Sequence, residues 1–274
     1  MNNFLNQRIR CLFAAIITLG LVFGCGLREI PELRIVQLCD PQLGFGQDGF
    51  DADVMRLEKA VQKINELAPD MVVVAGDMVN NGNDDEAIHI FKQIIAQVKA
   101  PILLAAGNHD LPEPVTAAGI RRYHALYGED YQAVECKGRC IIAVNTLLWR
   151  EAPPEASSRH ELFLRETLQK AKKKKQAVIL LSHVPPFVSS VDEPYEYYNL
   201  PESKRKDILR LCNENGVLIW LAGHTHTTSR RSYEHITILN GETTGRNFDN
   251  RPAGFRLLTI HPDQSFDWEF VALP

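Results

Sequence analysis

The sequence lacks the signatures of several protein classes. Its six cysteines include no C-x-x-C pair, so a zinc site made of thiolates is not expected. It has neither a P-loop nor a G-x-S-x-G motif, which argues against nucleotide-driven work and against serine hydrolysis. It also has no excess of positive charge, since the formal net charge is -4 at pH 7. The one dense basic run, residues 172–175, falls at the end of an expected helix, so no nucleic-acid partner is expected.

A long apolar segment is missing as well. The apolar run of residues 11–23 is shorter than the roughly 20 residues that cross a bilayer. It follows Arg8 and Arg10 and precedes Gly24-Cys25-Gly26, an order typical of a secretory signal. Residues 22–25 resemble a bacterial lipobox, although Phe23 is bulky for its place in that motif.

We therefore expect residues 1–25 to be a lipoprotein signal, with the exported protein held at a membrane surface by a lipidated Cys25. An ordinary signal peptide, an uncleaved anchor and a misassigned start are the alternatives. Residues 26–274 contain no repeat and no linker after Glu32, which favours a single domain. Hydrophobic residues make up 45% of the chain, enough for a sizeable core.

Five short apolar runs are each followed by an Asp, Asn or His. Such runs are typical of buried strands, and ligands bind at the carboxyl ends of strands in open α/β sheets. The runs and their following residues are 33–38 before Asp40-Pro41-Gln42, 71–75 before Gly76-Asp77, 101–106 before Gly107-Asn108-His109-Asp110, 177–181 before Ser182-His183, and 217–222 before Gly223-His224-Thr225-His226. Chance would rarely produce this repetition, so we expect these ends to form one site.

Helical patterns alternate with the expected strands. Apolar spacing predicts helices over residues 53–67, 84–98, 158–174 and 201–215, which favours an α/β sandwich with parallel central strands. Toward the C-terminus, residues 236–239, 254–260 and 266–271 read as closing antiparallel strands.

The residues at the strand ends suit a metal centre. Carboxylate and amide oxygens favour Mg and Mn, whereas imidazole favours Zn and Fe. A single zinc ion needs only three or four ligands, and this chain offers seven candidates: Asp40, Gln42, Asp77, Asn108, His183, His224 and His226. Seven ligands are enough for two ions that share a carboxylate, an arrangement that suits phosphoryl displacement.

The ordered motifs resemble those of the calcineurin-like metallophosphoesterases, which carry D-x-H, G-D, G-N-H-[DE], a lone His and G-H-x-H. The resemblance spans residues 34–226, and G-N-H-D with G-H-T-H is its most specific part. It implies a four-layer α/β/β/α sandwich of two mixed sheets flanked by helices. It also implies a metal-dependent phosphoric ester hydrolase, in which metal-bound hydroxide attacks phosphorus without a covalent phosphoenzyme.

The resemblance divides the ligands between two ions, expected to be Mn, Fe or Zn. Asp40 and His226 would bind the first ion, and Asp77 would bridge the two. The second ion would have three further ligands, namely Asn108, His183 and His224.

The resemblance also implies the catalytic residues. His109 would contact the phosphate and protonate the leaving group, and Asp110 would orient its imidazole. Asn108 would help to bind the substrate, which is expected to be a phosphorylated small molecule or protein. Arg246, in a Gly/Thr-rich loop, is either a second phosphate contact or an exposed turn residue.

One position departs from the family motif. Gln42 stands where the family has histidine, and an amide oxygen is a weaker ligand than imidazole. We therefore expect a weaker first site, biased towards Mn or Mg, with Gln42 bound directly, through water or not at all. The string Asp40-Pro41-Gln42-Leu43-Gly44 resembles a subgroup with D-P-Q-[FL]-G, whose members are described as protein serine/threonine phosphatases.

A phosphomonoesterase of the serine/threonine phosphatase type is therefore the expected function. A phosphodiesterase or nucleotide pyrophosphohydrolase of the same fold is the alternative among enzymes. A non-catalytic metal- or phosphate-binding lipoprotein, with Gln42 marking a decayed site, is the alternative from another class.

Two features remain open in the sequence. Tyr195, Tyr197 and Tyr198 lie in a long loop and would either stack on a ligand or pack within the loop. Cys136 and Cys140 bracket an expected hairpin tip, where an oxidising compartment would allow them to pair.

Overall fold

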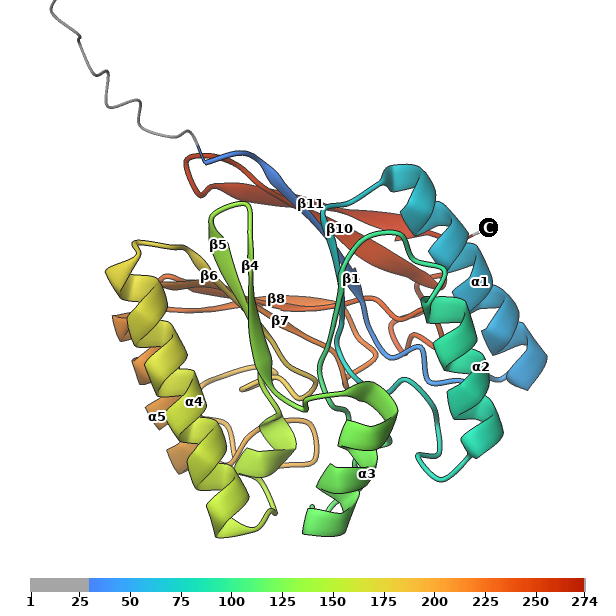
Figure 1. Ribbon diagram of the computed structural model, residues 1–274, viewed down its shortest axis with the longest axis horizontal. Helices are drawn as coiled ribbons and strands as arrows, with labels where there is room; N and C mark the ends of the chain where they lie inside the picture. The colour runs from blue at the N-terminus through green and yellow to red at the C-terminus, as the bar shows by residue number, and fades with distance from the viewer. Residues whose placement is uncertain (1–29, 274) are drawn as a thin grey trace, which may run out of the picture.

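The computed structural model describes residues 30–273, which form two β-sheets packed face to face between helices (Figure 1). The strands are β1 (Leu33–Leu38), β2 (Met71–Val74), β3 (Ile102–Leu104), β4 (Gln132–Cys136), β5 (Arg139–Ala143), β6 (Val178–Leu181), β7 (Val217–Ala222), β8 (Ser229–Tyr233), β9 (Ile236–Asn240), β10 (Gly254–Ile260) and β11 (Phe266–Ala272). The helices are α1 (Phe50–Leu67), α2 (Asp85–Ile95), α3 (Ala117–Tyr127), the 3-10 helix η1 (Thr146–Trp149), α4 (Pro154–Lys173) and α5 (Glu202–Glu214).

Both sheets are mixed, as expected. The first has the order β11-β10-β1-β2-β3 and the second the order β4-β5-β6-β7-β9-β8. Neighbours among β1, β2 and β3, and among β5, β6, β7 and β9, are parallel, whereas β4, β8, β10 and β11 pair antiparallel. Helices α1 and α2 cover the first sheet, and α4 and α5 cover the second (Figure 1). The predicted α/β/β/α sandwich is confirmed.

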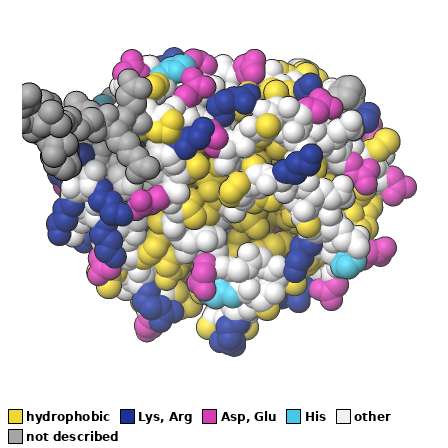
Figure 2. Space-filling view, turned by 45° about the horizontal axis from the view of Figure 1, so that its top comes forward, with side chains coloured by type: hydrophobic (Ala, Val, Ile, Leu, Met, Phe, Trp, Pro, Cys, Tyr) yellow, Lys and Arg dark blue, Asp and Glu magenta, His cyan; other side chains and the backbone are white. Residues whose placement is uncertain are grey.

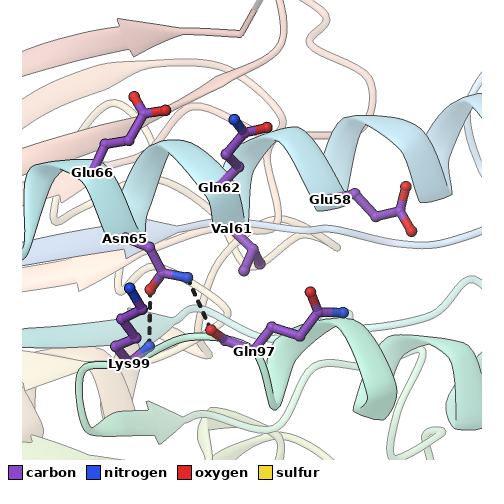
Figure 3. Close-up of a pocket in the computed structure, with 7 residues that line it drawn as sticks. All are labelled: Glu58, Val61, Gln62, Asn65, Glu66, Gln97 and Lys99. Carbon is purple, nitrogen blue, oxygen red and sulfur yellow. Dashed lines mark hydrogen bonds between the residues drawn. The ribbon is translucent and has the colours of Figure 1, made fainter.

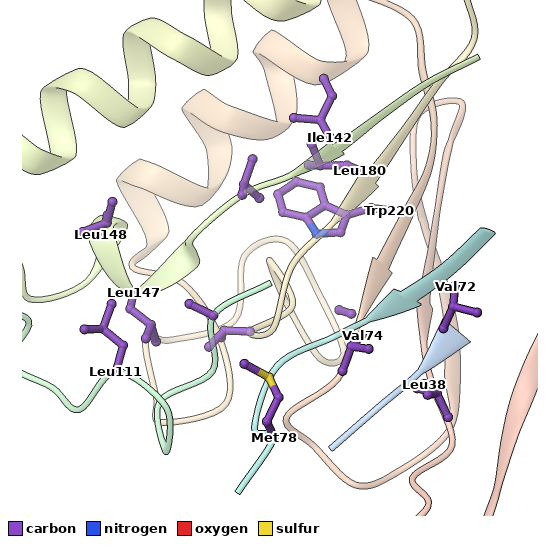
Figure 4. Close-up of a cluster of buried hydrophobic side chains, with 14 of the residues drawn as sticks. Leu38, Val72, Val74, Met78, Leu111, Ile142, Leu147, Leu148, Leu180 and Trp220 are labelled. Atoms are coloured by element: carbon purple, nitrogen blue, oxygen red, sulfur yellow. The ribbon is translucent and has the colours of Figure 1, made fainter. Parts of the chain in front are cut away.

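Strand side chains alternate between two buried layers because successive residues of a strand point to opposite faces. In β2, Met71 and Val73 face the other sheet, whereas Val72 and Val74 pack toward the helices. Figure 4 shows part of the helix-side cluster, in which Met78 continues the packing from Val74 toward the second sheet. The parallel strands are thus held on both faces, and their carboxyl ends meet at one edge.

Helix α3 was not expected from the sequence. It begins after Thr116, whose hydroxyl accepts a hydrogen bond from the Gly119 amide at 3.0 Å. Tyr123 is its only buried residue, so the segment has no apolar face that a helical spacing would reveal. The four expected helices are present, with ends that differ by a few residues from the predicted ranges.

The disulfide considered for the β4–β5 hairpin is not formed. The register places Cys136 opposite Arg139 and Cys140 opposite Glu135. Cys136 packs against the layer between the sheets and Cys140 belongs to the helix-side layer, so the two thiols point to opposite faces. The two-residue tip of the hairpin sets this register.

The expected signal and Cys25 lie outside the described residues. No helix within residues 30–273 has the length and apolar character needed to cross a bilayer. On the face drawn in Figure 2, positive and negative side chains are interspersed around a central area of hydrophobic side chains, so neither sign dominates that face.

Candidate active site

The five expected strand ends converge on one edge of the sandwich. Asp40 follows β1, Asp77 follows β2 and His109 follows β3, all from the first sheet. His183 follows β6 and His224 follows β7, both from the second sheet. The side chains therefore meet at the seam between the sheets, where parallel strands from both layers end together.

One group of donor atoms surrounds the imidazole of His183. Its Nδ1 donates to the carbonyl of Ala75 at 2.7 Å, which directs Nε2 toward the other donor atoms. This Nε2 lies 3.0 Å from Asn108 Oδ1, 3.0 Å from His224 Nδ1 and 3.3 Å from Asp77 Oδ2. Two nitrogens and two oxygens facing one another at these distances fit a single divalent ion.

A second group lies around Asp40, which is fully buried. Its Oδ1 is 3.7 Å from His226 Nε2, and its carboxylate accepts the His224 amide at 3.0 Å. His226 Nδ1 donates to the Arg246 carbonyl at 2.6 Å, so the free Nε2 faces Asp40. The buried amide oxygen of Gln42 has no hydrogen-bond partner within residues 30–273. The nitrogen of the same amide lies 3.4 Å from Asn80 Oδ1, and an unpartnered buried acceptor of this kind fits a metal ligand.

Five of the seven metal-ligand candidates have an unusual backbone conformation. Positive φ angles occur at Asp40 (46°), Gln42 (39°), Asp77 (51°), His224 (69°) and His226 (51°). Each such non-glycine residue costs on the order of 1–3 kcal/mol, and such residues cluster at functional sites. The site is therefore held in place by the fold at the expense of local backbone strain.

The motif glycines allow the ligands to approach one another. A Cβ atom at Gly223 would lie 2.6 Å from Asp40 Oδ2, and one at Gly76 would lie 2.7 Å from His183 Nδ1. Any larger residue would displace these side chains. This packing explains why glycine accompanies Asp77 and His224 in their motifs.

The buried charges oppose and balance one another. Burial raises the pKa of Asp40. Burial also opposes ionisation of Asp77, but the charge and hydrogen bond of His183 outweigh it and hold the pKa of Asp77 below its usual range. Burial disfavours the charged form of His183, yet Asp77 and Asp40 raise its pKa to about 9. The two carboxylates therefore stabilise positive charge at the position of His183.

The pKa values of His224 and Asp110 are shifted as well. Burial, reinforced by His183, lowers the pKa of His224 to about 3, so this imidazole is a neutral ligand candidate. Burial and the charge of Asp77 raise the pKa of Asp110 to about 8.

The role expected for Asp110 as the partner of His109 is wrong. Its carboxylate accepts the backbone amides of Met78 at 2.9 Å and Gly107 at 3.0 Å. The Nδ1 of His109 instead donates to the carbonyl of Asn80 at 2.6 Å, and its Nε2 lies 4.0 Å from Asp77 Oδ2. Asp110 therefore shapes the loop, and Asn80 orients the imidazole toward the site.

Tyr197 reaches the site from the aromatic loop, a contact that the sequence did not reveal. Its hydroxyl accepts a hydrogen bond from Asn108 Nδ2 at 3.0 Å, and its carbonyl accepts one from His224 Nε2 at 3.0 Å. Arg150 donates to the same carbonyl at 3.0 Å and forms an ion pair with Glu113 at 3.1 Å. The loop is thus anchored over the Asn108 side of the site.

Aromatic residues flank the other side. Phe248 stacks on the His226 ring at 4.9 Å, and Phe45 meets the same ring edge-on at 5.3 Å. The guanidinium of Arg246 lies over Phe248 at 5.3 Å. Arg246 is therefore beside the site, and its expected phosphate contact stays a prediction.

A pocket of about 700 Å³ lies away from the site, between α1 and the segment that follows α2. In Figure 3, Asn65 donates to the Gln97 carbonyl and accepts from the Lys99 amide, both at 2.9 Å. These residues precede β2 and β3, so the pocket lies at the amino ends of the strands. It contains none of the expected ligands, and its hydrogen bonds tie two helical segments together.

Comparison with known proteins agrees with the geometry. The profile of the calcineurin-like phosphoesterase family matches residues 33–228. The chain belongs to this family. It is accordingly a metal-dependent phosphoric ester hydrolase, and Asp77, His183 and His224 form a cluster that could hold a metal ion.

Two curated relatives match most of the chain. The serine/threonine-protein phosphatase CPPED1 of Homo sapiens is 26% identical over 244 residues, which cover 81% of this chain and 78% of the relative. The 3',5'-cyclic adenosine monophosphate phosphodiesterase CpdA of Pseudomonas aeruginosa is 26% identical over 249 residues, covering 85% and 87%.

Solved structures share the fold. A dimetal phosphatase from Danio rerio superposes with a TM-score of 0.61 at 13% identity, covering 89% of this chain and all of the other. A purple acid phosphatase from yellow lupin superposes with a TM-score of 0.63 at 17% identity, covering 87% of this chain and 51% of the other.

Proposed function

We propose that this hydrolase is a phosphomonoesterase that acts on phosphorylated serine or threonine. The observation that carries the proposal is the position of Asp77, between the donors around His183 and the imidazole of His109. A substrate phosphate bound there would have its leaving oxygen within reach of a proton donor. The similarity to a serine/threonine-protein phosphatase over 81% of the chain supports this choice of substrate class.

The chain's residues would divide the work as follows. Two bound ions would supply Lewis acidity and an activated water. Asn108 would turn its amide from Tyr197 to a phosphate oxygen. His109 Nδ1 stays bonded to Asn80, which directs Nε2 toward the site, and the doubly protonated imidazole would give its Nε2 proton to the leaving alkoxide. The carboxylate of Asp77, 4.0 Å from that Nε2, stabilises the protonated imidazole.

For the metals, we propose Gln42 as a direct ligand of the first ion, because its amide oxygen is buried without a partner. An amide ligand favours harder ions, so Mn suits this position better than Zn. Asp40 and His226 would complete that ion's ligands, with Asp77 shared between the two positions.

Hydrolysis of two nitrophenyl esters tests the function. The purified protein, loaded with Mn, should hydrolyse the phosphate monoester faster than the bis-nitrophenyl diester. Faster diester turnover would favour a phosphodiesterase, an alternative supported by the similarity to CpdA over 85% of the chain. Absence of turnover with Mn, Zn, Fe and Mg would favour a protein that only binds metal or phosphate.

We also propose export and membrane anchoring through Cys25, based on the order of basic, apolar and small residues in 1–25. Mass spectrometry of the mature N-terminus tests this proposal. A diacylated Cys25 is expected, and Cys25→Ser should release the protein from the membrane fraction. An unprocessed Met1 in a soluble fraction would contradict it.

A further inference from the structure

A pocket of about 370 Å³ opens directly beside the metal-ligand candidates. Thr225, which stands between His224 and His226 in the chain, lines its floor together with Val188. Its walls include two aromatic rings, Tyr198 and Phe248. The pocket therefore begins where the phosphate-binding part of the site ends.

The aromatic walls come from separate loops and are unusually exposed. Tyr198 lies 5.7 Å from the His224 ring and is 43% exposed. Phe248 stacks on His226 and is 48% exposed. Covering such rings with an apolar group of the substrate removes hydrophobic surface from water, which favours binding.

A second pocket of about 650 Å³ shares Arg231 with the first and continues along β8. Arg231 donates through Nε to the Val188 carbonyl at 2.9 Å, which fixes its guanidinium between the two pockets. Arg231 also donates to the Arg230 carbonyl at 3.0 Å and forms no ion pair with a carboxylate among residues 30–273. Arg230, the preceding residue of the strand, lies over the Trp268 ring at 5.3 Å instead. Strand β8 is also an edge of the second sheet, so this positive surface is accessible along its length.

The length and chemistry of the two pockets favour one kind of occupant. A small leaving group would fill the first pocket only and would leave Arg231 without a carboxylate partner. An extended peptide advances about 3.3 Å per residue, so a few residues beyond the phosphorylated one reach the second pocket. The guanidinium of Arg231, which has no carboxylate partner among the described residues, complements an acidic side chain there.

Resting on the proposed phosphomonoesterase function, we propose that this groove selects phosphopeptides by their flanking sequence. A bulky apolar or aromatic residue next to the phosphorylated one lies between Tyr198 and Phe248. An acidic residue farther along the peptide binds Arg231.

Phosphoserine peptides of equal length test the proposal. Each peptide has Phe or Ala next to the phosphoserine and Glu or Lys two or three residues from the phosphoserine. Both arrangements are made, with these residues on the N-terminal side or on the C-terminal side of the phosphoserine. We expect kcat/KM to be at least about fivefold higher for the Phe/Glu peptide than for the Ala/Lys peptide. The Glu preference should shrink at high salt because exposed charge pairs are screened.

Two variants assign the preferences to the groove. Arg231→Ala should remove the Glu preference and keep the Phe preference, whereas Tyr198→Ala should do the reverse. Each preference is a ratio within one variant, so changes in general activity cancel. The matched control Arg210→Ala, an exposed arginine on α5, should keep both ratios.

The outcomes separate this proposal from the proposed function. Equal kcat/KM for all peptides, with nitrophenyl phosphate hydrolysed, would overturn the groove and leave the phosphatase intact. If neither the peptides nor nitrophenyl phosphate is hydrolysed, peptide binding is measured by fluorescence anisotropy instead. A Phe/Glu preference in Kd without turnover would support the groove and contradict the phosphatase, whereas equal Kd values would overturn the groove.

Discussion

The amide nitrogen of Asn108 donates a hydrogen bond to the hydroxyl of Tyr197 across 89 positions of the chain, at 3.0 Å. The oxygen of the same amide lies 3.0 Å from His183 Nε2, so Asn108 joins the ligand group to the aromatic loop. A substrate phosphate that uses this amide nitrogen must first displace Tyr197.

Removal of the Tyr197 hydroxyl should therefore strengthen the binding of the substrate phosphate. A net hydrogen bond is worth about 0.5–1.5 kcal/mol, so Tyr197→Phe should lower KM, or the inhibition constant of inorganic phosphate, by about two- to tenfold. Steady-state kinetics with phosphate as inhibitor measures this. Tyr195→Phe, whose hydroxyl contacts Arg150 at 3.3 Å, is the matched control. A raised KM in Tyr197→Phe would mean that the hydroxyl binds substrate instead.

Loss of the His109 imidazole should affect turnover and leave the metals bound. General acid catalysis typically contributes about 10²–10⁴-fold, so His109→Gln should lower kcat by that range for esters of poor leaving groups. Metal analysis should give the same content as the unaltered protein, because His109 is not among the facing donor atoms around His183. His89→Gln, an exposed histidine on α2, is the control. Unchanged kcat in His109→Gln would remove the general-acid role.

Gln42 should make one ion easier to remove than the other. Protein loaded equally with Mn and Zn and then dialysed against a chelator should lose one ion first. Gln42→His should slow this loss, since imidazole is the stronger ligand. Two ions of equal lability in the unaltered protein would contradict a weakened first site.

Arg256 should be important for stability. It is 1% exposed and pairs with the equally buried Glu242 at 3.2 Å while donating to Gln37 Oε1 at 3.0 Å. Arg256→Met leaves a buried carboxylate without its main partner, which should lower the free energy of unfolding by about 3–5 kcal/mol. Urea unfolding measures this value. The double variant Arg256→Met/Glu242→Gln should recover part of the loss, and no recovery would indicate that packing, not charge, is responsible.

His160 should make the fold sensitive to acid. Burial lowers its pKa from 6.5 to about 3, and its ring lies between Tyr131 at 4.9 Å and Trp149 at 4.7 Å. In the unfolded chain, His160 binds a proton below about pH 6.5, whereas in the folded chain it stays neutral down to about pH 3. Stability contributed by neutral His160 is therefore complete above pH 6.5 and is lost as the pH falls toward 3, by roughly 4–5 kcal/mol in total.

The His160→Gln variant isolates this effect. Its glutamine oxygen can still accept the Asn145 amide, which His160 Nε2 accepts at 3.2 Å. The free energy of unfolding of the variant should fall less steeply between pH 6.5 and 4 than that of the unaltered protein. Identical slopes would assign the acid sensitivity to other groups.

The sequence predicted the sandwich and the convergence of the ligands because both depend on strands. An apolar run shows where a strand ends, and parallel strands bring those ends to one edge. The meeting of Asp40 and Asp77 with His183 was therefore predictable, although His183 is more than a hundred residues from either carboxylate. By contrast, the contact of Tyr197 with Asn108 depends on the path of a loop, and no periodic pattern records that path.

The partner of His109 and the open question of the disulfide depend on equally local features. The partner of His109 is a backbone carbonyl at Asn80, and carbonyl positions leave no trace in residue identity. Whether Cys136 and Cys140 lie on the same face depends on the register of the β4–β5 hairpin. A shift of one residue in this register moves a side chain to the opposite face.

The left-handed backbone at Asp40, Gln42, Asp77, His224 and His226 has a consequence for laboratory evolution. Glycine or asparagine relieves such strain, so a library selected only for resistance to heat or proteases should accumulate these residues at the five positions. The selected variants would be stable but would lack catalytic activity. Selection for catalysis is then what keeps Asp, Gln and His at these five positions.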